Sequence, residues 1–447
     1  MTRPNGRRLL VLAAAFVLPL SLAAPVSAHA QQSAATGYGH GHKAEKKVVG
    51  YFTQWGIYGR NFLVNNLETS GSAAKLTHIN YAFGNVSPEG TCYIAPGAGV
   101  GDPWADFQTS FTAEQSVDGV ADTSEQALAG NFNQLRELKK KHPKLKVNIS
   151  LGGWSWSNYF SDAALTPASR KKFVASCVDL YLKGNLPLLD GKGGPGTAKG
   201  IFDGIDLDWE WPASEGEPGN VVRPEDKQNF TKLVAEFRKQ IDAYGKTQRK
   251  HYELTAFLPA DPVQIDRGFE VRKIFKDFDF ATIQGYDLNG TWDPVTNHQG
   301  QLFSPKADVN PNKFSVELAI GHYLKNGAPA NKLVLGVPYY GRGWTAVPNQ
   351  NRGLYQPSST PAPGTYEAGY EDYKVIAALP GKTYYDPRAV ASWFYDGTTF
   401  WTFDDANVLK VKSLYIKARG LGGAMAWSLD GDDGKGTLTK TLSAGLR

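Results

Sequence analysis

The chain has 447 residues, of which 41% are hydrophobic and 20% are charged, a composition typical of an ordinary globular protein. Its formal net charge of +5 falls to +2 once residues 1–30, which hold three arginines and no acid, are set aside. This balance gives no sign of the clustered basic residues that nucleic-acid binding needs. Eleven tryptophans are the unusual feature. They predict either an aromatic-rich core or flat apolar faces for a ligand.

The N-terminal residues predict an export signal. Arg3, Arg7 and Arg8 precede an apolar run at 9–22, and a small-residue cleavage motif follows at 28–30. The run is too short to span a membrane, so we expect a signal peptide at 1–30, a flexible segment at 31–46 and a secreted, extracellular protein. The Sec and twin-arginine export routes both stay open. No later segment reaches 18 apolar residues, and no membrane partner is expected.

The cysteines and histidines bear on cross-links and metals. Cys92 and Cys177 are the two cysteines of the chain, and in a secreted protein they can pair. The sequence leaves this pairing open, because it does not place their Cα atoms within bonding distance. The eight histidines show no metal-ligand spacing, so no metal is expected.

From Lys47 onward, short apolar runs alternate with helical patterns. The runs that predict strands are Val48–Phe52, His78–Phe83, Lys146–Leu151, Gly204–Asp208, Glu253–Leu258, Phe278–Tyr286, Lys332–Val337 and Gly422–Trp427. Apolar spacings of three and four predict helices at Ser124–Lys141, Pro224–Tyr244 and Lys313–Asn326. Helices between strands imply a parallel sheet, and eight such units fit a closed (β/α)8 TIM barrel of the α/β class.

One interval, between the seventh and eighth predicted strands, is far longer than a helix and two loops need. It contains strand-like fragments at Thr383–Tyr385, Ala391–Tyr395 and Thr399–Phe403. We predict a small α+β insertion domain at 344–401, which divides the barrel into 47–343 and 402–447. A helix at Ala406–Arg419, with Asp405 as its N-cap, then returns the chain to the barrel.

The fourth predicted strand carries three acids on one face: Asp206, Asp208 and Glu210. Residues two apart on a strand point the same way, so these acids point into the barrel, and barrel active sites lie at the C-terminal ends of strands. Three neighbouring carboxylates repel one another, so at least one must hold a proton. We predict catalysis here rather than a cation site or a purely structural polar cluster. By the same parity, Trp209 packs on the helices and Asp203 supports the strand entrance.

The segment Asp203–Glu210 matches the DGxDxDxE signature of glycoside hydrolase family 18, the retaining chitinases, and the chain resembles that family. Further matches are Gly50-Tyr51-Phe52, Ser150-Leu151-Gly152-Gly153, Tyr286-Asp287, Tyr339-Tyr340-Gly341-Arg342-Gly343-Trp344 and Met425-Ala426-Trp427. Together these matches cover nearly the whole chain from Lys47 onward, in order. The insertion resembles the chitinase insertion domain of the bacterial subfamily called A.

The resemblance implies a reaction without a cofactor, in which the 2-acetamido oxygen of the sugar attacks its own C1. Glu210 would protonate the glycosidic oxygen and then activate water. Asp208 would hydrogen-bond the acetamide N–H and share a proton with Asp206, and Tyr286 would fix the acetyl oxygen. The expected catalytic residues are therefore Glu210, Asp208, Asp206 and Tyr286.

The family motifs and the strand-end loops also predict residues around the substrate. They are Tyr51, Ser150, Trp154, Gln284, Asp287, Trp292, Tyr339, Arg342, Trp344 and Trp427. Among these, Tyr51 and Ser150 would support Asp206, and Trp427 would form the floor under the acetamido sugar. Gln284 stands where many relatives have Met and adds a hydrogen-bonding group. Other tryptophans divide into strand-end candidates, Trp55 and Trp156, and ones expected to be structural, Trp104, Trp393 and Trp401.

The predicted function is that of a secreted chitinase, expected to be monomeric, with chitin and chitooligosaccharides as partners. Two alternatives stay open. An endo-β-N-acetylglucosaminidase acting on N-glycans shares the acidic signature, and a chitin-binding lectin can use the same barrel, although such lectins usually lack the acid that Glu210 provides. The sequence leaves endo or exo action, direction and product length open.

Overall fold

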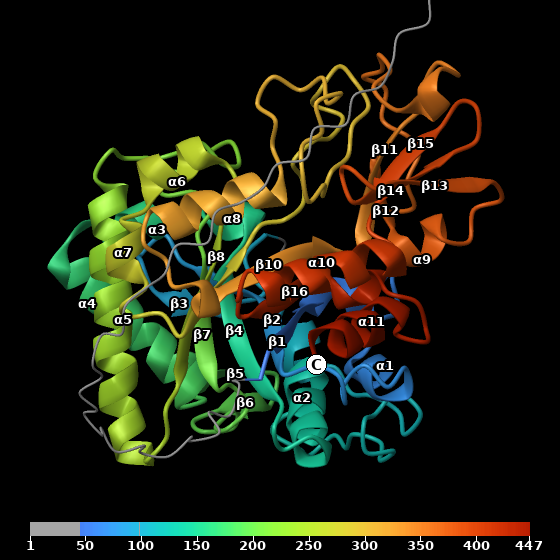
Figure 1. Cartoon of the computed structure of the whole chain (residues 1–447). Coiled ribbons are helices and arrows are strands. Elements are labelled where there is room, and N and C mark those ends of the chain that lie inside the picture. Colours follow the sequence, from blue (N-terminus) through green and yellow to red (C-terminus); the bar gives the residue numbers. More distant parts are fainter. Residues whose placement is uncertain (1–44, 98) are drawn as a thin grey trace, which may run out of the picture. The chain divides into compact units, whose positions relative to one another are not determined.

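The computed structural model describes residues 45–97 and 99–447 (Figure 1). The predicted signal peptide at 1–30 and the predicted flexible segment up to residue 44 lie outside the described residues. Within the described ranges, none of the helices combines the length and the apolar character that a membrane span requires.

Eight parallel strands form a closed barrel, in the order β1-β16-β10-β9-β8-β7-β4-β2, and β1 also pairs with β2. The strands are β1 (Lys47–Thr53), β2 (His78–Val86), β4 (Lys146–Gly152), β7 (Gly204–Asp208), β8 (Glu253–Leu258), β9 (Phe280–Ile283), β10 (Leu333–Pro338) and β16 (Gly423–Trp427). Nearly every residue on them is buried, because helices cover one face and the barrel interior covers the other. The predicted TIM barrel and its eight strands are confirmed.

Figure 1 shows the helices around the outside of these strands. They are α1 (Val64–Thr69), α2 (Gly130–Lys141), α3 (Phe160–Leu165), α4 (Pro167–Cys177), α5 (Asp226–Gln248), α6 (Pro262–Gly268), α7 (Val271–Ile274), α8 (Val316–Lys325), α10 (Ala406–Ala418) and α11 (Thr437–Leu446). The four helices expected from the sequence are present, and Asp405 caps α10 by accepting from the N–H groups of Asn407 and Val408. This capping confirms the predicted N-cap.

The start of α2 differs from the prediction, which placed it at Ser124. Gly130 has a φ of +60°, which stops the helix from extending further toward the N-terminus. Before it, the Gln126 side chain donates to a carboxylate oxygen of Asp122 and to the carbonyl of Leu128. These side-chain bonds fold residues 122–128 as a loop, although their apolar spacing resembles a helix.

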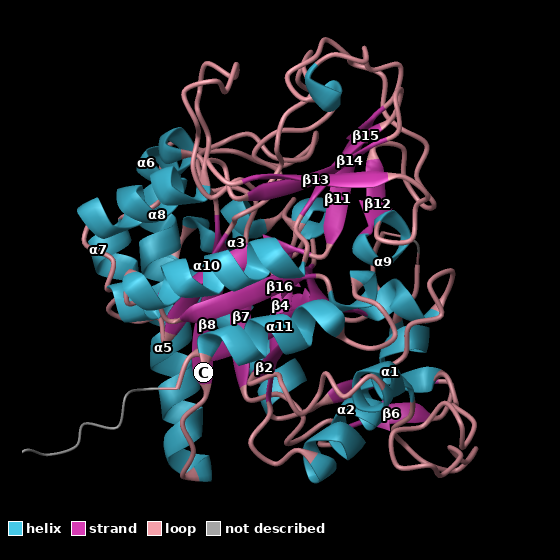
Figure 2. Cartoon of the chain, turned by 45° about the vertical axis from the view of Figure 1, so that its right-hand side comes forward, coloured by secondary structure: helices cyan, strands magenta, loops and turns pink. Residues whose placement is uncertain are grey.

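The insertion between β10 and β16 is built on an antiparallel sheet of order β12-β11-β15-β14-β13, which lies apart from the barrel strands in Figure 2. Its elements are β11 (Tyr340–Trp344), β12 (Tyr370–Asp372), α9 (Tyr373–Ile376), β13 (Lys382–Asp386), β14 (Ala391–Tyr395) and β15 (Phe400–Phe403). All three strand-like fragments of the sequence became strands of this sheet. The sheet begins four residues before the predicted boundary at 344 and ends two residues after the one at 401.

Arg60, in the loop after β1, ties the insertion to the barrel. Its guanidinium pairs with Asp372 of the insertion and, at 3.0 Å, with Asp430, which follows β16. It also lies 4.2 Å from the ring centre of Tyr366. Both carboxylates are almost fully buried, so this single side chain connects three segments that are distant in the sequence.

The connections outside the barrel include three short strands and a disulfide. The strands are β3 (Cys92–Tyr93), antiparallel to β2, and the hairpin of β5 (Leu186–Leu189) and β6 (Lys192–Gly194). Cys92 and Cys177 form a disulfide that joins β3 to the end of α4. The pairing that the sequence left open is therefore present in the structure.

Candidate active site

Three carboxyl groups stand in a row at the C-terminal end of β7. Asp206 is fully buried and accepts hydrogen bonds from the hydroxyls of Tyr51 (2.8 Å), Ser150 (2.8 Å) and Thr255 (2.6 Å). These hydroxyls come from β1, β4 and β8, so barrel closure is what brings them together. Burial raises the pKa of Asp206 above its usual range, while the three donors oppose that shift. The predicted support of Asp206 by Tyr51 and Ser150 is present in the geometry.

Asp208 interacts with both of its acidic neighbours, and more strongly with Glu210 than with Asp206. Burial, followed by the nearby charges of Glu210 and Asp206, raises the pKa of Asp208 well above its usual range. Burial also raises the pKa of Glu210 to about 8, against a hydrogen bond from Asp208 that lowers it. Each of these two carboxyls therefore favours its protonated form, and the protonation of one affects that of the other. The expected proton sharing between Asp206 and Asp208 stays a prediction.

The acids open into a cleft of about 910 Å³ at the C-terminal ends of the barrel strands. Six of the eleven tryptophans line it: Trp55, Trp154, Trp156, Trp211, Trp292 and Trp427. Trp154 is 50% exposed and Trp292 is 59% exposed, so both present open indole faces. Flat apolar faces beside carboxyl groups suit a ligand with apolar ring faces and polar edges, such as a sugar.

Trp427, the last residue of β16, forms part of the cleft floor. Its ring stacks on Phe83 with centroids 5.7 Å apart and lies 5.2 Å from the ring of Tyr51. The N–H of Phe83 donates to the side-chain oxygen of Gln54 at 3.1 Å. Phe83 and Gln54 line the cleft, although neither was predicted as a cleft residue. Their positions at the C-terminal ends of two predicted strands could have identified them.

The opposite wall of the cleft comes from the chain after β9 and from the insertion. Tyr286 lines the cleft and stacks on Phe257 at 6.1 Å. Asp287 accepts two bonds from the Arg342 guanidinium, at 2.8 and 3.0 Å, and this carboxylate raises the pKa of Arg342. Gln284 also lines the cleft, and its side-chain oxygen accepts from the N–H of Ala260 at 3.3 Å. All four predicted residues of this wall therefore face the same cavity.

Trp344 and Tyr339 do not reach the cleft, which contradicts their predicted contact with substrate. Trp344 is fully buried in the insertion core, 5.8 Å from the ring of Phe400, because the insertion sheet already begins at Tyr340. Tyr339 is 1% exposed, and its hydroxyl interacts with Thr439 on α11. The hydroxyl of its neighbour Tyr340 donates to Asp287 at 2.6 Å. Because successive residues of an extended chain point to opposite sides, Tyr339 points away from Asp287 and the cleft.

The other tryptophans and Asp203 lie outside the cleft lining. Trp209 is 2% exposed and stacks on Phe160, as predicted, and Trp393 and Trp401 are also buried. Asp203 accepts from the N–H of Val147 and pairs with two lysines at the strand entrance, as predicted. Trp104, which was also expected to be structural, is 55% exposed and therefore lies outside the buried core.

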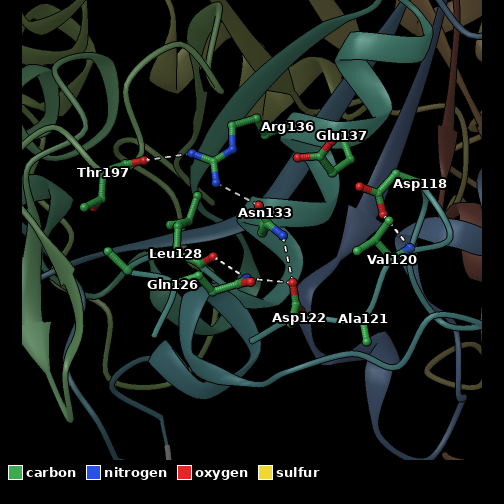
Figure 3. Close-up of a pocket in the computed structure, with 11 residues that line it drawn as sticks. Asp118, Val120, Ala121, Asp122, Gln126, Leu128, Asn133, Arg136, Glu137 and Thr197 are labelled. Atoms are coloured by element: carbon green, nitrogen blue, oxygen red, sulfur yellow. Dashed lines mark hydrogen bonds between the residues drawn. The ribbon is translucent and has the colours of Figure 1, made fainter. Parts of the chain in front are cut away.

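A second pocket, of about 370 Å³, lies among the loops before α2 (Figure 3). None of its eleven lining residues is aromatic or belongs to the predicted site. Its polar groups largely satisfy one another: Gln126 and Asn133 both donate to Asp122, and Arg136 donates to Asn133 and to the carbonyl of Thr197. The pocket therefore leaves few polar atoms for a ligand, in contrast to the aromatic cleft.

Comparisons with known proteins agree with this geometry. The family described as Glycosyl hydrolases family 18 matches residues 47–432. Chitinase A1 of Niallia circulans is 39% identical over 90% of this chain and 58% of its own length, and chitinase C of Streptomyces lividans is 38% identical over 89% and 59%. The chain thus spans less than two thirds of these relatives. The catalytic domain of a psychrophilic chitinase B from Arthrobacter TAD20 superposes with a TM-score of 0.87, at 50% identity, over 91% of this chain and 96% of that one.

Proposed function

Because the chain belongs to glycosyl hydrolase family 18, we propose that it is a chitinase, which hydrolyses the β-1,4 bonds between N-acetylglucosamine units of chitin. The observation that carries this proposal is the row of three carboxyls, Asp206, Asp208 and Glu210, beneath a cleft with six tryptophans. The names of the similar proteins, chitinase A1 and chitinase C, support the same substrate class.

Glu210 is the proposed general acid and base. Since burial raises the pKa of its carboxyl to about 8, it is mostly protonated at neutral pH and can donate to the glycosidic oxygen as the bond to C1 breaks. After the first sugar leaves, the Glu210 carboxylate accepts a proton from the attacking water. The group therefore returns to its protonated state at the end of each cycle.

The proposed nucleophile is the acetamido oxygen of the substrate, which forms a bond to C1 as the glycosidic bond breaks and gives a cyclic oxazolinium ion. Asp208 would accept a hydrogen bond from the acetamide N–H, and its Oδ1 is buried without a hydrogen-bond partner among the described residues. Tyr286, across the cleft, would hold the acetyl group for attack. Water then opens the oxazolinium ion with overall retention at C1.

The proposed substrate contacts follow from the cleft lining. Trp427 would lie under the reacting sugar, while the exposed rings of Trp154 and Trp292 would stack on sugars to either side. Asp287 and Arg342 would contact the polar edges of these sugars from the far wall.

We also propose that the protein is secreted and acts as a monomer. The N-terminal pattern at 1–30 supports export, and the Cys92–Cys177 disulfide suits an oxidising compartment.

The test is product analysis on a chitin hexamer, by chain length and anomer, with the wild type and Glu210→Gln. The wild type should release short oligomers whose new reducing ends are initially β. Glu210→Gln should lose almost all turnover while keeping its unfolding temperature, because an amide of the same shape cannot donate the proton.

Two outcomes would replace the proposal. Binding of the hexamer by the wild type without any release of products would indicate a lectin. Release of glycans from a high-mannose glycoprotein, with no action on the hexamer, would indicate an endo-β-N-acetylglucosaminidase. Equal turnover in the wild type and in Glu210→Gln would show that Glu210 is not the general acid.

A further inference from the structure

The backbone of Glu210 is held by side chains instead of by the barrel sheet. β7 ends at Asp208, so Glu210 lies beyond the ladder of strand hydrogen bonds. Its N–H donates to the Ser157 hydroxyl at 2.8 Å. The Ser157 hydroxyl in turn donates to the carbonyl of Gly153 at 2.8 Å, and the side chain is fully buried. One serine thus connects the end of β4 to the backbone of the proposed general acid.

The carbonyl of Glu210 is held from the other side. It accepts from the Asn220 side-chain amide at 3.0 Å, and the Asn158 amide donates to the Asn220 oxygen at 2.9 Å. Gly216 makes this approach possible, because a Cβ at that position would lie 2.1 Å from the Glu210 carbonyl. Ser157 and Asn158 come from the loop after β4, and Asn220 comes from the loop after β7.

We propose that Ser157 and Asn220 are positioning residues, which together fix the main chain of Glu210 so that its carboxyl meets the glycosidic oxygen. This inference rests on the proposed function of Glu210 as general acid. Neither residue touches the reacting atoms, and both act through the peptide groups on the two sides of Glu210. A proton donor must lie within hydrogen-bond distance of its acceptor, and a misplacement of about 1 Å can cost about 100-fold in rate.

Without either contact the main chain of Glu210 can move, although its carboxyl group is chemically unchanged. In Ser157→Ala the N–H of Glu210 loses its acceptor, and in Asn220→Ala the carbonyl loses its donor. Each variant should lower kcat/KM for the chitin hexamer by about 10- to 100-fold. The affinity for substrate measured by binding alone should stay close to wild type, because the tryptophans of the cleft are untouched.

A second substrate separates positioning of the acid from a general weakening of the site. A chitobioside of 2,4-dinitrophenol has a leaving group that departs without protonation, and kcat/KM reports only the steps up to bond cleavage. On this substrate Ser157→Ala and Asn220→Ala should lose less than about threefold, since the displaced acid is not needed. Equal losses on both substrates would overturn the inference, as would wild-type rates on both.

Ser161→Ala is the matched control. Ser161 is also a fully buried serine, three residues from Asn158, but its hydroxyl bonds Asp226 and Arg223 and does not touch Glu210. Ser161→Ala should have a lower unfolding temperature than the wild type, as Ser157→Ala should. It should nevertheless keep the wild-type rate on both substrates. A Ser161→Ala variant with the substrate-dependent loss expected of Ser157→Ala would contradict the inference.

The controls also distinguish this inference from the proposed function. If the wild type itself releases nothing from the hexamer, the proposed function fails. If the wild type is active, Glu210→Gln is inactive and Ser157→Ala is normal, the function stands and the positioning role fails.

Discussion

The three acids at the end of β7, Asp206, Asp208 and Glu210, lie in three different environments. Asp206 is surrounded by three hydroxyl donors and Asp208 faces a second carboxyl. Glu210 is the least buried of the three and lies at the cleft end of the row, with the charge of Asp287 nearby. The alternation along the strand predicted that the acids share a face. Which acid keeps its proton depends on partners from β1, β4 and β8, and the strand's own sequence does not contain them.

The raised pKa of Glu210 predicts the alkaline limit of activity. A general acid works while protonated, so kcat/KM should be maintained below its pKa of about 8 and should fall as the pH rises through that value. The charge of Asp287 contributes to raising this pKa, so Asp287→Asn should move the alkaline limb to lower pH. Rate measurements on the hexamer across the neutral and alkaline range test both expectations. An alkaline limb at the ordinary pKa of a glutamic acid would contradict them.

The two kinds of tryptophan predict opposite effects of substitution. Trp344→Ala removes a fully buried indole from the insertion core, and we expect the free energy of unfolding to fall by about 3–5 kcal/mol, with little change in KM. Trp292→Ala removes an exposed ring, so stability should hold while KM for the hexamer rises about two- to tenfold. Urea unfolding and hexamer kinetics on both variants test this prediction. A loss of stability in Trp292→Ala together with a raised KM in Trp344→Ala would contradict it.

At the scale of elements, the apolar patterns of the sequence predicted most helices and strands correctly. The helix faces were predicted because apolar residues recur at the spacing of a helix, and the eight strands were predicted from short apolar runs, since both faces of a barrel strand are buried. The start of α2 was missed because Gln126 bonds Asp122 and the carbonyl of Leu128 and so stabilises a loop in an apparently helical stretch. The domain boundaries at 344 and 401 stay predictions, although the insertion sheet extends slightly beyond both.

Arg60 predicts how the insertion is coupled to the barrel. Arg60→Met leaves the buried carboxylates of Asp372 and Asp430 with one partner fewer, so the free energy of unfolding should fall by about 3–5 kcal/mol. Because Tyr366, which packs on Arg60, adjoins Glu367 in the cleft wall, KM should rise more for the hexamer than for a trimer.

Arg238→Met is the control for this prediction. Arg238 is 13% exposed where Arg60 is 12% exposed, and it also pairs with two acids, Asp242 and Asp279, but it lies on α5 outside the cleft lining. Arg238→Met should lower the free energy of unfolding, but its KM should not rise more for the hexamer than for the trimer. The same dependence in both variants would exclude a specific role of Arg60 at the cleft wall.

At the scale of the whole molecule, barrel closure gathers residues that are far apart in sequence. The six tryptophans of the cleft come from loops after β1, β4, β7 and β9 and from β16 itself. The excess of tryptophan was visible in the composition, and strand-end positions identified most of these residues. Trp344 was wrongly predicted to lie in the cleft because its exposure depends on the distant segments that cover it.

The disulfide predicts a stability effect that leaves activity intact. Cys92 and Cys177 close a loop of 85 residues, so replacing both with alanine should lower the free energy of unfolding by about 2–5 kcal/mol. Neither cysteine lines the cleft, and the hexamer should be cleaved at the wild-type rate. Urea unfolding of the wild type with and without a reductant, beside the double variant, tests this. If a reductant opens the disulfide and the free energy of unfolding of the wild type does not change, the prediction is contradicted.

The sequence by itself determined the barrel, the presence of the insertion and the face on which the three acids lie. Eight apolar runs between helical patterns indicated the barrel, the excess length of one interval indicated the insertion, and the alternation of side chains along a strand placed the acids on one face. The family motifs added the candidate residues at the strand ends. Only the tertiary structure decided that Glu210 is held by Ser157 and Asn220, that Arg60 joins the insertion to the barrel, and that Trp344 and Tyr339 face away from the cleft. These contacts join segments that only barrel closure and the folding of the insertion bring within a few ångströms of one another, and no local spacing encodes them.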